Sequence, residues 1–469
     1  MDDLLDRDAV DLSALLAAGQ VSAAEVMAAT LARIAAVNPG VNAIVSLRDG
    51  DALMAQARAA DIGPRKGWLH GIPVAIKDLA QAAGLPTTKG SPLLRDAVAD
   101  SDEIMVARLR AAGAIVIGKT NVPEWGLGSH TFNPLFGATR NPWDRGRSAG
   151  GSSGGAAVAL ATGMVAVADG SDMMGSLRNP AGWTNTYGLR PTWGLVPSEP
   201  EGDTFLHQLA TLGPMARSPR DVAALLATQS GPDPRQPHGL PAFRAELLDC
   251  SLDGLRIGWL GDWGGAWPME PGIIATCEAA LAQFATLGCT VAAPEPPFPA
   301  ADLWDAWTTL RSWAVAGGLG ALHADPATRA ALKPEAVWEV ERGLALSAMD
   351  VHRASLIRSR WFAAAAALFQ RFDALVLPSA QVWPFALDMR WPDRIAGLAM
   401  DSYHRWMEVV VPVSLIGLPC LCIPAGFGPQ GLPVGLQLFG PRGADLRLLQ
   451  IGHGWHGSAP WARQRPAPA

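Results

Sequence analysis

The sequence predicts an α/β fold, in which a β-sheet carries helices on its faces. Short apolar runs bounded by glycine and proline alternate with segments of helical periodicity before residue 235, and such runs return after residue 370. Between them, residues 235–365 are alanine-rich, tryptophan-dotted and helical in period. Because strand-like runs flank this stretch, we expect one domain over residues 1–469, with residues 235–365 as a helical, tryptophan-rich and variable cap insertion within it.

The first elements of the chain are predicted to be helices. Residues 11–20 and 21–37 have the apolar spacing of helices, and Ser22 and Glu25 match a capping box at the start of the second. We expect this second helix to end near the Asn-Pro-Gly sequence at residues 38–40.

Strand-like runs and helical segments alternate in the rest of the chain. The pattern predicts a helix over residues 102–113. Apolar, strand-like runs occupy residues 73–78, 114–119, 157–170, 372–380, 420–427 and 433–440. The sheet is therefore expected to combine segments from both sides of the cap insertion.

Composition limits the classes of protein that the chain can belong to. The 469 residues carry 37 Lys and Arg against 43 Asp and Glu, a net charge of −6. This balance argues against a nucleic-acid partner, because binding to phosphates needs clustered cations. With 49% hydrophobic and 17% charged residues the chain is globular, and a chain of this size buries about three quarters of its surface on folding.

The sequence also predicts a cytoplasmic protein. Its five cysteines are too few and too irregularly spaced for a disulfide scaffold, and the N-terminal MDDLLDRDAVDL is acidic where a secretory signal is positively charged. Two uncharged stretches, residues 148–168 and 409–441, are interrupted by glycines and hydroxyls in the first and by prolines in the second. We therefore expect no membrane span in either.

Two motifs resemble nucleotide or metal sites but lack the necessary context. Residues 113–120 spell GAIVIGKT, which matches the P-loop pattern, yet the residues between the glycines read as a strand and a helix precedes them. His453 and His456 form an H-x-x-H pair without a nearby acidic residue in the sequence. We expect no nucleotide, no metal ion and no cofactor.

Candidate catalytic groups lie in two glycine-containing turns and one apolar run. The nine histidines offer no obvious Ser-His-Asp arrangement, so a nucleophilic serine needs a base other than the histidine of such a triad. The sequence RSAGGSSGGA places Ser152 and Ser153 among four glycines, and DGSDMMGSLRNPA places Ser176 at a tight turn. Lys77 follows the apolar run PVAI, where an ammonium group is poorly solvated.

At these residues the chain resembles the amidase signature family, whose catalytic apparatus is a Ser-cis-Ser-Lys triad. The resemblance covers most of residues 8–230 and 370–450. It is carried by VSAAEVMAATLARIAAVNPGVNA, GIPVAIKD, TTKGS, GKTNVPEWG, YGLRPTWGLVPS, TLGPMARSPRDVAALL and GLPVGLQLFG. The resemblance implies the amidase signature fold, a large mixed β-sheet core flanked by helices on both faces.

The family pattern implies that Ser176 is the nucleophile, that Ser152 is a bridging serine after a cis peptide bond, and that Lys77 is the base. A lysine acts as a base only when burial lowers its pKa enough to leave the amine neutral. Ser152 would then pass a proton from Ser176 to Lys77 and return it to the departing amine.

The resemblance further implies an oxyanion hole made by the backbone N–H groups of Met173, Met174, Gly175 and Ser176. Here the sequence departs from the common Thr-Gly-Gly-Ser form of the family, because a methionine stands where the family usually has glycine. The backbone donors survive this change, whereas the shape of the pocket differs.

Four further residues are expected to support the site. Ser153 and Ser171 are predicted hydrogen-bonding partners, and Asp172 and Arg178 are predicted to brace the loop. Because Asn179 follows Arg178, no second cation is evident there to hold a substrate carboxylate. A neutral and fairly apolar substrate is therefore expected.

These expectations together predict a serine hydrolase that cleaves carboxamide C–N bonds through an acyl-enzyme. The expected partner is a small-molecule amide, neutral, apolar or aryl, with esters and carbamates (urethanes) as further substrates. Two alternatives stay open: the glutaminase-type A subunit of an aminoacyl-tRNA amidotransferase, and a non-catalytic binding protein on the amidase fold. A homodimer also stays open.

Overall fold

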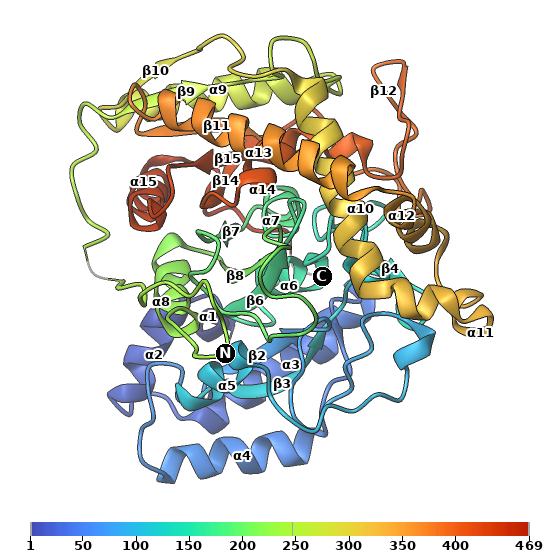
Figure 1. The fold of residues 1–469 in the computed structure, drawn as a ribbon. Coiled ribbons are helices and arrows are strands. Elements are labelled where there is room, and N and C mark those ends of the chain that lie inside the picture. The colour runs from blue at the N-terminus through green and yellow to red at the C-terminus, as the bar shows by residue number, and fades with distance from the viewer. Residues whose placement is uncertain (1, 246, 468–469) are drawn as a thin grey trace.

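An eight-stranded mixed sheet forms the centre of the fold (Figure 1). The structure is a computed structural model that describes residues 2–245 and 247–467. The strand order is β10-β9-β11-β15-β14-β7-β8-β6. Parallel pairing joins β10, β9 and β11, whereas the other neighbours pair antiparallel. The strands are β6 (Val167–Asp172), β7 (Tyr187–Arg190), β8 (Thr211–Ala216), β9 (Arg256–Trp259), β10 (Thr290–Ala292), β11 (Ala374–Pro378), β14 (Cys420–Phe427) and β15 (Pro433–Phe439).

A smaller three-stranded sheet, in the order β1-β3-β2, adjoins the main sheet where β2 contacts β6. Its strands are β1 (Ile44–Val45), β2 (Pro73–Lys77) and β3 (Ile115–Thr120). Two short hairpins complete the strands, β4 (Phe132–Asn133) with β5 (Gly137–Ala138) and β12 (Arg394–Ile395) with β13 (Leu398–Ala399). The contact between β2 and β6 brings together two of the predicted apolar runs, residues 73–78 and residues 157–170.

Helices cover both faces of the main sheet, as predicted. Along β14, Leu421 and Ile423 belong to one hydrophobic core, and Cys420 and Cys422 belong to cores on the opposite face, because strand side chains alternate. The first face packs against α8 (Pro219–Gln229), α9 (Ile273–Thr286) and α15 (Asp445–Ser458). The second face packs against α6 (Gly154–Ala161) and α7 (Asn179–Thr184).

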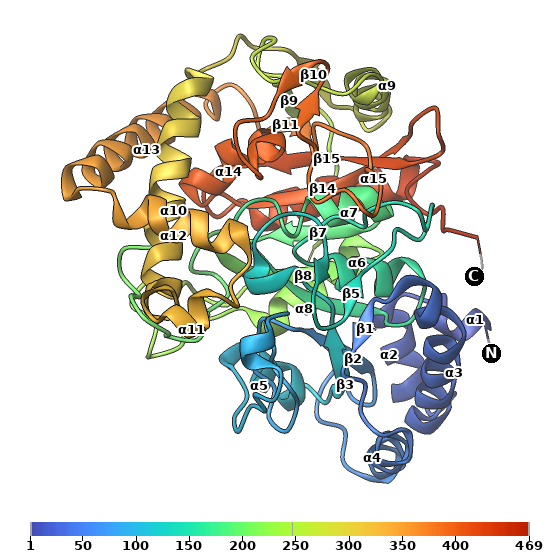
Figure 2. The same cartoon turned by 90° about the vertical axis from the view of Figure 1, so that its right-hand side faces the viewer.

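The cap helices lie on the side away from the N-terminal helices (Figure 2). The cap consists of α10 (Ala300–Ala324), α11 (Pro326–Arg329), α12 (Pro334–Leu344) and α13 (Ala348–Leu368). Within the predicted insertion 235–365, residues 256–292 instead supply β9, α9 and β10 to the main sheet, so the helical part covers residues 300–368. The remaining helices are α1 (Asp2–Leu5), α2 (Ala9–Ala17), α3 (Ala23–Val41), α4 (Gly50–Ile62), α5 (Ile104–Ala111), α14 (Val411–Ile416), and the 3₁₀ turns η1 (Pro92–Leu94), η2 (Glu124–Gly126) and η3 (Arg405–Val410).

Local predictions hold to within two or three residues at most element ends, with two larger differences. The capping box of Ser22 and Glu25 is present, but α3 continues through Pro39 to Val41 before its left-handed cap. The apolar run 157–170 is not one strand, because a turn that includes Gly163 (φ +71°) separates α6 from β6. A fully buried helix such as α6 has no polar face, so its sequence lacks the amphipathic period of a helix.

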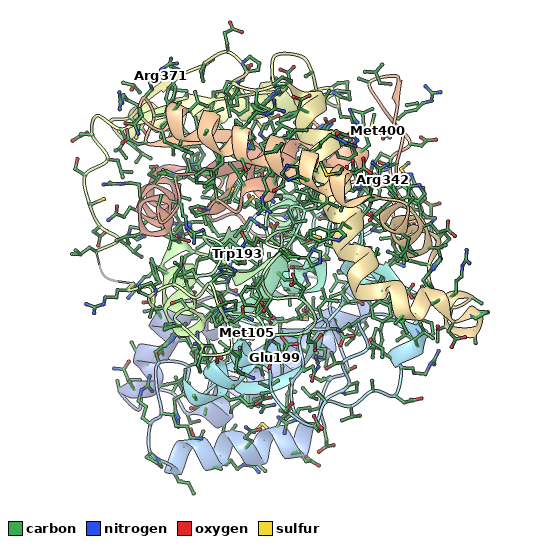
Figure 3. All side chains as sticks on the ribbon, viewed as in Figure 1. Met105, Trp193, Glu199, Arg342, Arg371 and Met400 are labelled. Atoms are coloured by element: carbon green, nitrogen blue, oxygen red, sulfur yellow. The ribbon has the colours of Figure 1, made fainter. Side chains whose placement is uncertain are left out.

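Side chains fill the space between these layers (Figure 3). Met105 of α5, for example, is fully buried in the largest core. Among the described residues, no helix is both long enough and apolar enough to cross a bilayer.

Candidate active site

Lys77 ends β2 inside the protein, with 1% of its surface exposed. Its Nζ donates hydrogen bonds to the hydroxyl oxygens of Ser152 (2.9 Å), Ser153 (2.8 Å) and Ser171 (2.9 Å). Its backbone N–H donates to Asp169 Oδ1 at 3.0 Å, which fixes the end of β2 against β6. Three hydroxyl groups thus converge on one buried amine, and all three belong to residues predicted for the site.

Burial lowers the pKa of Lys77 to about 7, against the opposing attraction of Asp169 and then of Asp172. The side-chain atoms that its amine bonds are hydroxyl oxygens, which stabilise an ammonium less than a carboxylate would. A large fraction of the amine is therefore neutral near pH 7. A neutral amine is the form that accepts a proton.

The serine-glycine loop is closely packed at the start of α6. The peptide bond between Gly151 and Ser152 is cis. A Cβ atom added to Gly155 would lie 2.4 Å from the backbone nitrogen of Asn121, so a larger residue does not fit there. The glycines that could indicate a flexible loop instead allow the backbone segments to approach one another.

Ser176 lies in the turn between β6 and α7 and is 6% exposed. Ser152, Ser171 and Ser176 line the same pocket. Within residues 2–245 and 247–467 no hydrogen bond joins the hydroxyl groups of Ser152 and Ser176. The two hydroxyls therefore share a cavity without a direct hydrogen bond.

Backbone N–H groups around Ser176 differ in their availability. The N–H of Gly175 donates to Asp172 Oδ1 at 2.9 Å. In the described part of the chain, the N–H groups of Met173, Met174 and Ser176 donate to no protein acceptor. Of the four predicted oxyanion donors, three are therefore unengaged, and the Gly175 N–H already has a partner.

A buried ion-pair network fixes the other side of this turn. Asp172 accepts two hydrogen bonds from Arg178, both at 2.9 Å, and one from the backbone of Leu177 at 3.0 Å. Arg190 also pairs with this carboxylate, at 3.2 Å. Although burial opposes ionisation, Arg178 and then Arg190 hold the pKa of Asp172 well below its usual range. Asp172 therefore stays charged and braces the turn.

The pocket has a volume of about 500 Å³ and a largely apolar wall. Besides the three serines, its lining includes Leu79, Lys89, Trp125, Leu127, Met173, Met174, Glu201, Arg311, Val315, Gly317, Gly318, Leu319 and Met407. The turn of Ser176 and the cap helix α10 supply facing parts of this wall. A small molecule with an apolar group fits a cavity of this size and character.

Comparison with known proteins agrees with this geometry. The family model described as Amidase matches residues 25–449. The chain belongs to the amidase signature family. The solved structure of a bacterial aryl acylamidase of the amidase signature enzymes covers 99% of both chains with a TM-score of 0.92 and 29% identity. The predicted family and fold are therefore confirmed.

Curated relatives of this amidase signature protein include hydrolases and components of amidotransferases. The acylamidase of Rhodococcus erythropolis is 34% identical over 98% of this chain and 97% of its own length. The A subunit of the glutamyl-tRNA(Gln) amidotransferase of Thermus thermophilus is 37% identical over 94% of each chain. Sequence identity alone therefore does not separate the two kinds of relative.

Sequence reasoning missed Arg311, a pocket residue of this amidase signature protein. Arg311 is 3% exposed and donates from Nε to Glu339 at 2.6 Å and from Nη2 to the Tyr403 hydroxyl at 2.7 Å. At the rim, Lys89 and Glu201 form an ion pair at 3.7 Å. Arg311 stands in no recognisable motif, so only the fold of the cap brings it to the pocket.

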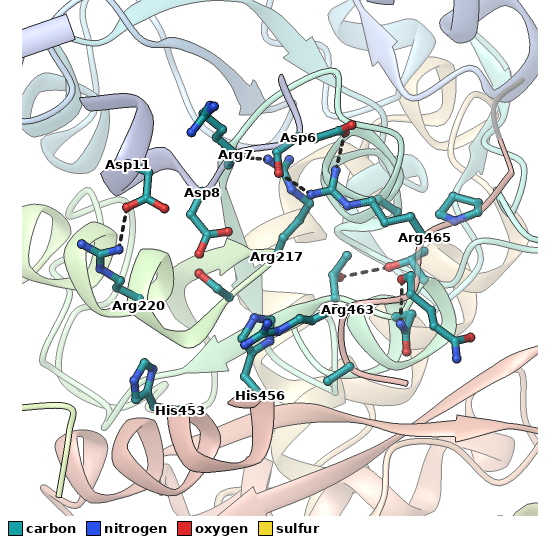
Figure 4. Close-up of a pocket in the computed structure, with 18 residues that line it drawn as sticks. Asp6, Arg7, Asp8, Asp11, Arg217, Arg220, His453, His456, Arg463 and Arg465 are labelled. Carbon is teal, nitrogen blue, oxygen red and sulfur yellow. Dashed lines mark hydrogen bonds and ion pairs between the residues drawn. The ribbon is translucent and has the colours of Figure 1, made fainter. Parts of the chain in front are cut away.

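A second cavity, of about 430 Å³, is lined by residues near both termini, and His453 and His456 form part of its wall (Figure 4). His453 contacts Asp249 at 2.9 Å, and His456 contacts the Tyr187 hydroxyl at 3.1 Å. Among the described residues, no group of three or more His, Cys, Asp or Glu could hold a metal ion. Residues that line this cavity form two ion pairs, Asp6 with Arg465 and Asp11 with Arg220.

The P-loop-like sequence is part of the fold. Residues 115–120 form β3, and the Lys119 side chain is fully buried. Its amine donates to the carbonyl of Ala80 at 2.5 Å and to the Thr87 hydroxyl at 3.0 Å, and it pairs with Asp78 at 3.7 Å. The Lys119 amine is thus bonded to groups inside the protein, where it is not accessible to a nucleotide phosphate.

Proposed function

We propose that the protein is a serine hydrolase that cleaves carboxamide C–N bonds through an acyl-enzyme. The observation that carries this proposal is the burial of the Lys77 amine among three hydroxyl groups beside a pocket that also contains Ser176. The Rhodococcus acylamidase and the bacterial aryl acylamidase support amide hydrolysis as the chemistry.

In this proposal Ser176 attacks the amide carbonyl carbon, and its proton moves through Ser152 to the neutral amine of Lys77. The negative charge that forms on the carbonyl oxygen is stabilised by the free N–H groups of Met173, Met174 and Ser176. The step needs Ser176 Oγ within hydrogen-bond reach of Ser152 Oγ, and catalytic hydrogen bonds of this kind often shorten when substrate binds.

The intermediate then expels the amine. The C–N bond breaks, Lys77 returns its proton through Ser152 to the departing nitrogen, and Ser176 keeps the acyl group as an ester. A water molecule next attacks this ester with the same proton relay, releasing the carboxylic acid and restoring the serine. One relay thus acts first as general base and then as general acid.

The proposed substrate is a neutral amide with an apolar or aryl group. Both cations that line the pocket are paired, Lys89 with Glu201 and Arg311 with Glu339. A substrate carboxylate would have to compete with these partners, whereas an apolar group contacts the methionine and leucine side chains of the wall. Esters and carbamates share the tetrahedral intermediate and are included as substrate classes.

A second candidate function is supported by the similarity to the A subunits of glutamyl-tRNA(Gln) amidotransferases. A chain with that function would require partner chains. A purified single chain that turns over aryl amides without a partner favours the hydrolase. A chain that hydrolyses glutamine only after its partner chains are added favours the amidotransferase.

The deciding experiment is intact-mass analysis after treatment with phenylmethylsulfonyl fluoride, together with p-nitroanilide, p-nitrophenyl ester and aryl carbamate substrates. We expect one covalent adduct in the wild type and none in Ser176→Ala, with turnover of at least the amide. An adduct retained in Ser176→Ala would refute the assignment of the nucleophile.

A further inference from the structure

The turn that carries Ser176 is bonded from the cap by two side chains of α10. The indole Nε1 of Trp307 donates to Met174 Sδ at 3.2 Å, and Nη1 of Arg311 donates to Met173 Sδ at 3.3 Å. Residues four apart lie on the same face of a helix, so α10 presents both donors side by side. The two acceptors are consecutive residues of the turn.

The guanidinium of Arg311, which donates to Met173, is held in place by other contacts. Arg311 is bonded to Glu339 of α12 at 2.6 Å and to Tyr403 at 2.7 Å, and Ser312 bonds the other carboxylate oxygen of Glu339 at 2.6 Å. A thioether is a weak acceptor on a flexible side chain. A fixed charged donor therefore restricts a methionine that would otherwise sample several conformations.

The two halves of the turn are held by different parts of the protein. Asp172 accepts the N–H groups of Gly175 and Leu177, which fixes the half that follows Met174. In the described chain, the backbone N–H groups of Met173 and Met174 have no such partner. The side-chain bonds from α10 are therefore the polar contacts that hold the first half of the turn.

We propose that Trp307 and Arg311 are positioning residues for the oxyanion hole. By holding the side chains of Met174 and Met173, they set the direction of two of the three free backbone N–H groups. This proposal rests on the proposed hydrolase function. It makes the cap helix part of the apparatus that stabilises the transition state, in addition to being a wall of the pocket.

The proposal is tested with Trp307→Phe, which keeps an aromatic ring and removes the N–H donor. The matched control is Trp263→Phe, because Trp263 is equally buried and donates its indole N–H to the carbonyl of Phe298, away from the turn. A second variant, Met174→Leu, removes the sulfur acceptor at nearly constant volume. It keeps the test valid if Trp307→Phe does not fold.

Three readouts are compared: kcat, KM, and inhibition by a trifluoromethyl ketone analogue of the substrate, whose hemiketal oxyanion occupies the hole. We expect Trp307→Phe to lower kcat about tenfold with little change in KM. A misplaced N–H donor stabilises the oxyanion less than a well-placed one, but more than a deleted one. The inhibition constant of the ketone should rise by the same factor. Met174→Leu should change both quantities in the same direction, whereas Trp263→Phe should leave them near wild type.

The double variant Trp307→Phe/Met174→Leu removes the same bond from both sides. We expect it to lose no more activity than the more damaging single variant. If the wild type is active, two results would overturn the proposal. One is a loss in the double variant equal to the product of the single losses. The other is an equal effect of Trp307→Phe and Trp263→Phe on kcat. A wild type that hydrolyses no amide, ester or carbamate would instead refute the proposed function, and this inference with it.

Discussion

Lys77 Nζ lies 2.9 Å from Ser152 Oγ, although 75 residues separate the two in the sequence. The end of β2 and the start of α6 bring them together inside the protein. Ser153 bonds the same nitrogen at 2.8 Å but, unlike Ser152, does not line the pocket. Two neighbouring serines thus contact one amine with almost equal geometry, and only one of them faces the place where substrate would bind.

This difference predicts unequal effects of the two alanine substitutions. Ser152→Ala removes the bridging hydroxyl, so we expect kcat to fall about 10²–10⁴-fold, the usual contribution of general acid-base catalysis. Ser153→Ala removes one hydrogen bond from Lys77 but leaves the relay intact, and we expect a loss of about tenfold or less. Steady-state kinetics on one p-nitroanilide measures both. Equal losses would contradict the assignment of Ser152 as the bridge.

The lowered pKa of Lys77 predicts a specific pH profile. Because burial brings this pKa to about 7 and only the neutral amine accepts a proton, kcat/KM should rise from pH 5 and level off above about pH 8. The measurement is kcat/KM from pH 5 to 9 in buffers of constant ionic strength. A flat profile, or one that falls with pH over this range, would contradict the role of Lys77 as base.

The same group predicts how stability changes with pH. Lys77 binds its proton less tightly when folded (pKa about 7) than when unfolded (10.5), so the unfolded chain holds more protons between these values. The free energy of unfolding of the wild type should therefore rise with pH there, by up to about 1.4 kcal/mol per pH unit from this group. Lys77→Met lacks the group and serves as the reference.

Urea unfolding of both proteins at pH 7 and pH 9 makes this comparison. We expect the wild type to gain about 2 kcal/mol over Lys77→Met between the two pH values. A difference that stays constant, or that moves in favour of the variant, would show that folding does not lower the pKa of this amine.

How far the sequence could predict this site depends on whether the contacts are local. Ser152 and Ser176 each stand in a short motif, and Lys77 follows an apolar strand, so their chemistry could be inferred from neighbouring residues. The bond from Arg311 to Met173 joins residues 138 apart, and it depends on the packing of α10 against α12, α13 and α14, which brings α10 beside the turn of Met173. A lone arginine in a helix carries no signal for that arrangement.

The prediction of the fold from the sequence is limited in the same way. The predicted strands at 420–427 and 433–440 coincide with β14 and β15, because glycine and proline mark their ends. Residues 256–259, in contrast, form a strand of the main sheet within a region whose overall composition favours helices. A strand of four residues is too short to stand out against its helical surroundings.

A last prediction concerns the glycines. Gly155→Ala should destabilise the protein by about 1–3 kcal/mol, since its Cβ would lie 2.4 Å from the backbone nitrogen of Asn121 and 2.6 Å from the backbone oxygen of Ala43. Gly320→Ala, inside α10, meets nothing within 4 Å and should stabilise the protein by about 0.5–1 kcal/mol, because alanine favours helix. Thermal unfolding of the two variants tests both signs. A harmless Gly155→Ala would mean that the start of α6 can shift, and the fixed placement of the Ser152 hydroxyl against Lys77 would then lose its structural basis.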